Sequence, residues 1–340
     1  MALIDKVAGS LFGLAFGDAY GAPTEFLSFD EILRRWPTGE PPDLQGDPVP
    51  VTDDTQMTIA VTEALLEGRA HGNFTARNLE PPLRRAFVRW LNDPDNDRAP
   101  GRTCLTACEG LEAGKPWTEA TVQSSKGCGA NMRVAPVGLL PAGSAGLTEE
   151  TRAAMAQFQA ALTHGHPTAL AASDLTARAI NDLLAGGELK TLPQRLRAYA
   201  ESQQLIYHAR WLGSLWERPG VMSPESFIWR GWEECLAVLD RLDAALINPD
   251  READPCLATG GGWVAEEALA TGLLCFLMFP DDPRKALWRA AVTSGDSDSI
   301  ACLTGAFIGA YHGIAAWPRD WIERIEYKDK LSRLAAELIA

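Results

Sequence analysis

The sequence lacks an excess of basic residues. Its 31 Lys and Arg residues are outnumbered by 45 Asp and Glu residues, which gives a formal net charge of −14. Binding to DNA or RNA draws on Lys and Arg side chains that neutralise phosphates, so this charge argues against a nucleic-acid partner. We expect no nucleic acid as the main ligand.

Cysteine occurs without the patterns that mark a disulfide framework. The chain has seven cysteines, an odd number, and none of them belongs to a Cys-x-x-Cys pair. Scattered cysteines in a long chain are typical of reduced thiols in a reducing compartment. We therefore expect a cytoplasmic protein.

Long uncharged hydrophobic runs are scarce, and only two segments approach the length and composition of a secretory signal or a membrane span. Residues 7–16 are as long as the apolar part of a secretory signal, but Asp5 offsets the positive charge that such a signal needs at its start. Residues 299–317 approach the roughly 20 residues that span a bilayer. This second segment contains Tyr311 and His312, so a buried helix is the better interpretation. We expect no membrane association.

Apolar residues at helical spacing are abundant, whereas alternating strand patterns, repeats and low-complexity tracts are absent. We predict an all-α fold, a compact orthogonal bundle of many helices, in which residues 1–340 form a single domain. We also expect a monomer. The clearest helical segments are 55–67, 150–162, 168–184, 232–246, 264–279 and 328–339.

Two rows of glycines stand four residues apart, one near each end of the chain. Glycine inside a helix costs about 1 kcal/mol relative to alanine, so each row needs a compensating gain. Close approach of two backbones is such a gain, and we predict that both helices are central and tightly packed. The rows are Gly9, Gly13, Gly17 and Gly21, and Gly305, Gly309 and Gly313.

The first segment whose side chains could take part in catalysis or metal binding is Val-Thr-Asp-Asp-Thr at residues 51–55. An amphipathic run follows it, and Gly68 is the expected end of that helix. The pattern places Asp53 and Asp54 side by side at a helix start. Simple capping is the alternative, because carboxylates and hydroxyls accept hydrogen bonds from the free N–H groups there.

Two further acidic segments lie far from the first. In Ser294–Ser299, Asp296 and Asp298 alternate around a serine, so both side chains can point to one side of an extended turn. An EF-hand is excluded there because Phe307 stands where the loop needs glutamate. In Gly17–Glu25, the glutamate comes just after a helix-like run.

Together the three segments supply six carboxylates and several hydroxyls, with no cluster of histidines beside them. An all-oxygen set suits Mg²⁺, with Mn²⁺ or Ca²⁺ as alternatives, rather than Zn²⁺. Carboxylates that gather without a cation raise one another's pKa, so a gathered set implies a bound metal. The spacing alone leaves open whether the segments meet.

A glycine-rich loop at Gly127–Asn131 could present backbone N–H groups to an anion, and a plain glycine turn is the alternative. A dinucleotide-binding fingerprint is excluded because Met132 occupies the place of its third glycine. His164 and His166 have no third partner at zinc-ligand spacing. No Gly-x-Ser-x-Gly segment supplies a serine nucleophile.

The order of these segments resembles the ADP-ribosylglycohydrolase family, and the likeness covers nearly the whole chain. Three of the matching motifs are the acidic segments described above. The other three lie between or beside them. The six segments are Gly17–Glu25, Thr52–Thr55, Gly127–Pro136, Thr163–His164, Gly261–Leu269 and Ser294–Ser299.

The resemblance implies an all-helical bundle that holds two Mg²⁺ ions, with Mn²⁺ as an alternative. The implied metal ligands are Thr52, Asp53, Asp54, Asp296, Asp298 and Ser299. The implied catalytic residues are Glu25, Asp54 and Asp296. The implied substrate contacts are Gly127, Cys128, Gly129, Ala130, Asn131, His164 and Trp263. Ser299 replaces the threonine that is usual in the family, and its hydroxyl offers the same ligand atom.

By the same resemblance, the protein is expected to be a glycosidase that acts on N-glycosyl compounds. It would remove ADP-ribose from a modified protein side chain, arginine first, so its partner is an ADP-ribosylated protein or ADP-ribose. Hydrolysis of O-linked or free small ADP-ribosyl compounds is one alternative. A non-catalytic, crystallin-like role is another, but every expected metal position keeps an oxygen side chain, which favours retained chemistry.

Overall fold

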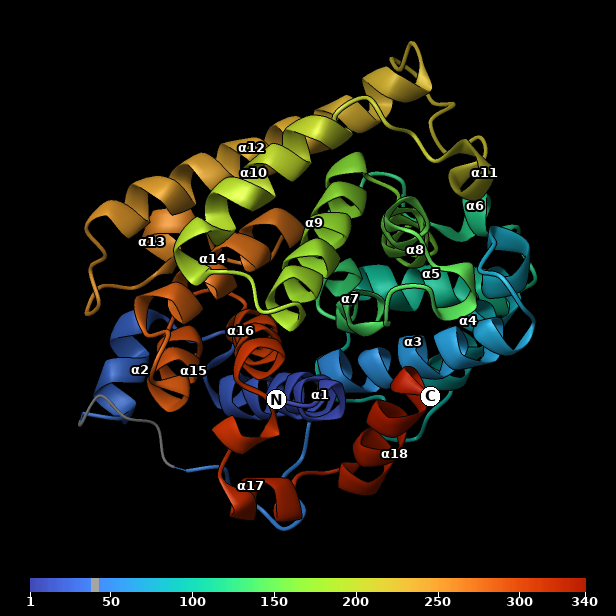
Figure 1. Cartoon of the computed structure of the whole chain (residues 1–340). Helices are drawn as coiled ribbons and strands as arrows, with labels where there is room; N and C mark the ends of the chain where they lie inside the picture. The colour runs from blue at the N-terminus through green and yellow to red at the C-terminus, as the bar shows by residue number, and fades with distance from the viewer. Residues whose placement is uncertain (38–42) are drawn as a thin grey trace.

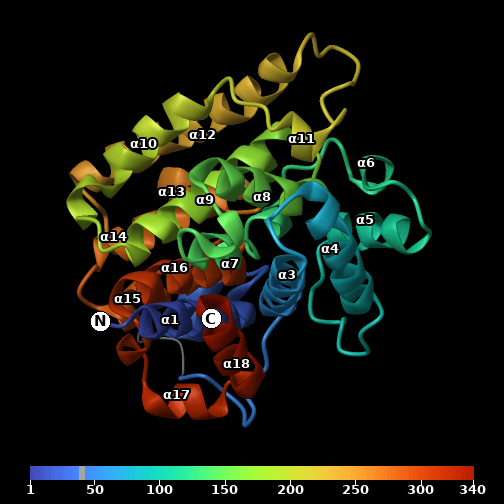
Figure 2. The same ribbon diagram turned by 45° about the vertical axis from the view of Figure 1, so that its right-hand side comes forward.

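The computed structural model of the chain describes residues 1–37 and 43–340. Helices cross one another at steep angles in several tiers (Figures 1 and 2). Among the described residues no sheet forms, and strand-like pairing is limited to three isolated bridges. The prediction of an all-α orthogonal bundle is confirmed.

The first half of the chain contains nine α-helices within the described residues. They are α1 Leu3–Gly21, α2 Phe29–Arg35, α3 Asp53–Ala70, α4 Ala76–Leu91, α5 Arg102–Glu112, α6 Trp117–Ala120, α7 Ala135–Leu139, α8 Glu149–Ala161 and α9 Pro167–Leu184. Three short 3-10 helices accompany them: η1 Ala22–Thr24, η2 Cys128–Ala130 and η3 Ser144–Gly146.

The second half continues the same pattern with nine more. They are α10 Leu192–Gln203, α11 Ala209–Leu212, α12 Pro224–Ile247, α13 Cys256–Thr259, α14 Ala265–Met278, α15 Pro283–Ala291, α16 Ser297–His312, α17 Arg319–Arg324 and α18 Lys328–Ile339. The 3-10 helices here are η4 Leu189–Thr191 and η5 Ile314–Ala316.

The six predicted helical segments correspond to α3, α8, α9, α12, α14 and α18. Side-chain caps fix several of their starts, as Thr148 does for α8 and Ser223 for α12. The prediction that Gly68 ends its helix is wrong. α3 continues to Ala70, and the chain turns only at Gly72, whose φ of 102° suits glycine.

The two glycine-striped helices, α1 and α16, pack against each other at the centre of the molecule (Figure 1). A Cβ added to Gly305 would overlap the carbonyl oxygen of Gly13, so the two backbones are in direct contact. Ser10 Oγ adds a hydrogen bond to the carbonyl of Ala306 at 2.9 Å. The prediction of central, tightly packed end helices is confirmed, although Gly313 follows α16 rather than lying within it.

α10 and α12 lie side by side along one edge of the bundle, with α9 and α14 beneath them (Figures 1 and 2). The α1–α16 pair lies below that layer, and α17 and α18 lie at the opposite edge. No helix of the described residues is both long and apolar enough to cross a membrane. The uncharged stretch after Ser299 is instead the buried α16.

Candidate active site

The first acidic segment forms the N-terminal turn of α3. Thr52 is the N-cap, and its Oγ1 accepts a hydrogen bond from the N–H of Asp54 at 3.4 Å. Asp53 and Asp54 follow in the first turn and are almost fully buried. Capping therefore explains Thr52, but the two aspartates do not cap the helix.

Asp18 of α1 is the residue that fixes this turn in place. Its buried carboxylate accepts hydrogen bonds from the backbone N–H groups of Thr52 and Thr55, each at 3.0 Å, and from the Thr55 hydroxyl. Burial is the main reason that the pKa of Asp18 rises to about 7. Asp18 was expected only as one of the six carboxylates of the three acidic segments. Its role in anchoring α3 was not predicted, although a carboxylate within a glycine-striped helix was a visible signal.

The second acidic segment forms the start of α16. The N–H of Asp296 donates to the carbonyl of Gly261 at 2.8 Å, and the N–H of Ser299 donates to Asp298 Oδ1 at 3.0 Å. Ser299 Oγ then donates to Asp54 Oδ1 at 3.0 Å. This last bond joins two segments that are 245 positions apart in the chain.

Glu25 reaches the same place from the end of η1. Thr24 Oγ1 donates to the carbonyl of Ala291 at 2.6 Å, and Ser297 Oγ donates to the carbonyl of Gly21 at 3.0 Å. These bonds hold η1 against the end of α15 and the start of α16. As a result, carboxylate oxygens of Glu25, Asp296 and Asp298 lie within 4.8 Å of one another.

The electrostatics of this cluster fit a divalent cation. Burial, followed by the charges of Asp298 and Asp53, raises the pKa of Glu25 to about 9. Burial and neighbouring carboxylates also raise the pKa values of Asp53, Asp54 and Asp296 well above the ordinary range. Such a cluster takes up either protons or a cation, and its oxygen atoms are the ligands that Mg²⁺ prefers.

A cavity of about 360 Å³ opens over the cluster. Most of the site residues expected from the sequence line it. They are Glu25, Asp53, Asp54, Gly127, Cys128, Gly129, His164, Trp263, Asp296, Asp298 and Ser299. The structure thus brings together residues from the start, the middle and the end of the chain.

Three of the expected residues lie outside the cavity lining. Thr52 stands one residue before the lining aspartates of α3. Ala130 and Asn131 are fully buried behind the glycine-rich loop. The carbonyl of Ala130 accepts a hydrogen bond from Gln159 at 2.8 Å, and Asn131 Nδ2 donates to Ala265 at 3.0 Å. In this structure, both residues contact the protein interior.

The glycine-rich loop is held by backbone contacts to its neighbours. The N–H of Cys128 donates to the carbonyl of Trp263 at 3.1 Å, and the N–H of Gly127 donates to Ser125 Oγ at 3.3 Å. These two amides are therefore engaged within the protein and do not face an anion. The loop continues only into the three-residue η2, so it lacks the long helix whose dipole would favour an anion.

His164 borders the cavity beside this loop and is fixed from behind. The buried guanidinium of Arg133 donates to Thr163 Oγ1 at 2.7 Å, and that oxygen lies 2.8 Å from Nδ1 of His164. Burial, followed by the charge of Arg133, holds the pKa of His164 well below its usual range. Because Thr163 accepts from Arg133, we assign its own proton to Nδ1, which leaves Nε2–H of a neutral ring as the donor.

Comparison with known proteins bears on the whole chain. The sequence model of the ADP-ribosylglycohydrolase family matches residues 1–340. The chain belongs to the ADP-ribosylglycohydrolase family. It is accordingly an enzyme of the glycohydrolase class, as the resemblance predicted.

Relatives of this glycohydrolase share about a quarter of its sequence. ADP-ribosylarginine hydrolase Tri1 of Serratia proteamaculans is 26% identical, covering 98% of this chain and 79% of that protein. ADP-ribosyl-[dinitrogen reductase] glycohydrolase of Rhodospirillum rubrum is 23% identical, covering 95% and 91%. A solved ADP-ribosylglycohydrolase-related protein shares the fold at a TM-score of 0.66 and 22% identity, covering 99% and 97%.

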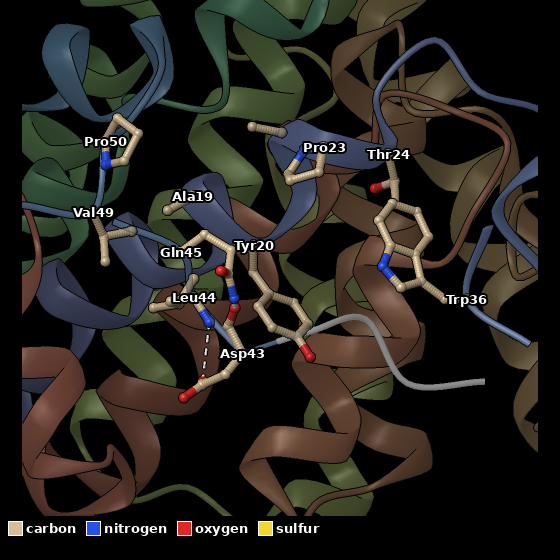
Figure 3. A pocket seen from close by; sticks show the side chains of 11 residues that line it. Ala19, Tyr20, Pro23, Thr24, Trp36, Asp43, Leu44, Gln45, Val49 and Pro50 are labelled. Carbon is tan, nitrogen blue, oxygen red and sulfur yellow. Dashed lines mark hydrogen bonds between the residues drawn. The ribbon is translucent and has the colours of Figure 1, made fainter. Parts of the chain in front are cut away.

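The glycohydrolase has another cavity, of about 180 Å³, which residues of η1 help to line. The rings of Tyr20 and Trp36 border it, with Pro23 and Val49 among the other apolar side chains (Figure 3). The carboxylate among its described lining residues, Asp43, accepts a hydrogen bond from Trp321 Nε1 at 2.6 Å. The described part of the lining therefore lacks a set of groups that could catalyse hydrolysis.

Proposed function

We propose that this glycohydrolase removes ADP-ribose from modified arginine side chains of proteins with the help of two divalent ions, Mg²⁺ in the first place. The observation that carries the proposal is the convergence of five carboxylates on one cavity. The expected ligands are Thr52, Asp53, Asp54, Asp296, Asp298 and Ser299. Two relatives whose names state arginine or dinitrogen reductase as the target support a protein substrate.

When bound, the ions would supply Lewis-acid polarisation and orientation of ribose hydroxyls and water. The chain's own residues do the remaining work. Glu25 lines the cavity beside Asp296 and Asp298, so its carboxyl group is placed to exchange a proton with the attacking water or the leaving group. Cleavage at the anomeric carbon passes through an oxocarbenium-like state, which nearby carboxylates stabilise.

His164 and Trp263 are the proposed substrate contacts on the cavity wall. The Nε2–H of His164 can donate to a ligand oxygen, and the indole of Trp263 offers a flat apolar face. The backbone of Gly127 and Gly129 allows the histidine ring to approach the loop closely, since a Cβ on either would lie within 3.4 Å of that ring.

The test is incubation of the purified protein with arginine-linked, serine-linked and DNA-linked ADP-ribose, each with Mg²⁺ and with a chelator. The proposal predicts release of ADP-ribose from the arginine-linked substrate only when Mg²⁺ is present. Preferential cleavage of the serine-linked substrate would favour the O-linked alternative. No release from any of the three substrates would favour the non-catalytic role.

A further inference from the structure

Two large aromatic side chains are exposed at the cavity that holds the carboxylates. Phe26 is 69% exposed and Trp263 is 45% exposed, and both line the cavity. Their ring centroids are 5.6 Å apart with an interplanar angle of 21°, so the rings are stacked on each other. One rises from the segment after η1 and the other from the loop before α14. An exposed aromatic pair at a cavity is a common form of ligand contact.

Phe26 also has an unusual backbone conformation. Its φ is 63°, a left-handed value that residues with a Cβ adopt only at a cost. The N–H of Leu27 donates to the carbonyl of Thr24 at 3.1 Å, so a hydrogen-bonded turn across Glu25 and Phe26 carries this conformation. This turn places Phe26 at the cavity, where most of its surface stays exposed.

The position of the pair relative to Glu25 indicates which part of a substrate it meets. Phe26 directly follows Glu25, so their Cα atoms are about 3.8 Å apart. In the proposed function Glu25 stands at the reacting carbon. Glu25 and the two stacked rings line one cavity, so the pair can reach the acceptor side chain, whereas the adenine base lies two riboses and a diphosphate away from that carbon.

We propose that the stacked pair of Phe26 and Trp263 is the acceptor subsite, and that it binds a guanidinium group. The inference rests on the proposed function and names the group that this site recognises. A planar guanidinium stacks on an aromatic face through its charge and its flat shape. A serine acceptor, which is small and uncharged, would gain little from the pair.

The test compares Phe26→Leu and Phe26→Tyr with the wild type on arginine-linked and serine-linked ADP-ribosyl peptides. Leucine keeps apolar volume but lacks a π face, whereas tyrosine keeps the ring. We expect Phe26→Leu to lower kcat/KM for the arginine-linked peptide by about three- to thirtyfold, the range of a cation–π contact. The serine-linked peptide should change by less than about twofold, and Phe26→Tyr should resemble the wild type on both peptides.

Binding of free ADP-ribose, which has no acceptor, gives a second measurement on the same proteins. Its Kd should stay within about twofold of the wild-type value in Phe26→Leu. Equal losses on both peptides, or a matching loss of ADP-ribose affinity, would overturn the acceptor subsite. A wild type that cleaves neither linkage would remove the proposed function itself, a failure visible before any variant is compared.

The variant Phe26→Gly separates the effect of the backbone conformation on stability from the effect of the aromatic ring on substrate preference. Glycine adopts a φ of 63° freely, so this variant should melt at or above the wild-type temperature and still lose the preference for arginine. A lower melting temperature together with an unchanged preference would show that the ring is structural and would contradict the inference.

Discussion

The two helix starts that build the site are positioned by different physical means. The N-terminal turn of α3 is held in place by hydrogen bonds to one buried carboxylate, Asp18. The start of α16 is also hydrogen-bonded, through Asp296 and Ser297, but it depends in addition on backbone packing. A Cβ on Gly21 would overlap Ser297, and a Cβ on Gly295 would overlap the carbonyl of Gly261. Hydrogen bonds orient one turn locally, whereas glycine contacts tie the other to the packing of the whole core.

This difference predicts how each half of the site fails. Damage to the glycine contacts of α16 should unfold the protein, because α1 and α16 form the central pair of the bundle. Damage to the Asp18 hydrogen bonds should leave most of the fold intact and misplace Asp53 and Asp54. In a metal centre assembled from both halves, the ligands at the start of α16 are therefore fixed by the core, whereas the ligands in the first turn of α3 can shift without unfolding the protein.

Gly305→Ala is expected to have the largest effect. The new methyl group would overlap the backbone of Gly13, which cannot move without separating α1 from α16. We expect a loss of about 3 kcal/mol or more in the free energy of unfolding, measured with urea. The matched control is Gly68→Ala in α3, where the nearest atom is Leu79 Cδ1 at 3.1 Å, the flexible end of a side chain. The control should stay within about 1 kcal/mol of the wild type. Equal losses in the two variants would refute the packing argument.

Asp18→Ala should have an intermediate effect on stability and a marked one on activity. It leaves the N–H groups of Thr52 and Thr55 without their acceptor, and it also removes a buried carboxylate whose pKa is about 7. The opposing changes leave a net loss of about 2 kcal/mol. We expect kcat to fall at least about tenfold through displacement of the α3 turn. Asp18→Asn keeps one acceptor oxygen, so its stability and its kcat should lie between those of the wild type and those of Asp18→Ala. A folded Asp18→Ala protein with wild-type kcat would show that Asp18 does not position the site.

The pH dependence of stability should show the smallest of the three effects. The folded-state pKa of Glu25 is raised from 4.5 to about 9, so folding favours its protonated form. Its stabilising contribution is complete below about pH 4.5 and is lost as the pH rises through about 9. In a chelator, the melting temperature should therefore fall between about pH 6 and about pH 9, and it should fall less in Glu25→Gln, which cannot ionise. Identical pH profiles for the two proteins would contradict the raised pKa.

The helices were largely predictable from local patterns in the sequence, whereas the residues of the site were expected from three acidic segments and from the resemblance to the family. Amphipathic spacing marked α3, α8, α9, α12, α14 and α18, and rows of glycine marked the α1–α16 contact. The acidic segments indicated where a metal centre could form. Four-residue helices such as α6, α11 and α13 were not predictable, because they are too short to show a period.

What the sequence left open depends on contacts between distant segments. The role of Asp18 follows from the approach of α1 to the amides of α3, which no spacing records. The conformation of Phe26 was also invisible, because nothing in a Glu-Phe-Leu run signals a positive φ. Gly68 suggested a helix end, yet the hydrogen bonds of α3 continue past it. Sequence patterns thus indicated which residues could form the site, whereas contacts between distant segments determine how those residues are held.

The central claim is that the starts of α3 and α16 form one divalent-cation site, and thermal unfolding with Mg²⁺ or a chelator at neutral pH tests it most directly. A cation that binds only the folded state stabilises it by mass action, so the wild-type melting temperature should rise with Mg²⁺ and fall again with chelator. The double variant Asp54→Asn, Asp298→Asn should melt at or above the wild-type temperature in chelator, because repulsion is relieved, and it should lose most of the response to Mg²⁺. A double variant that gains as much from Mg²⁺ as the wild type would show that the ions bind elsewhere.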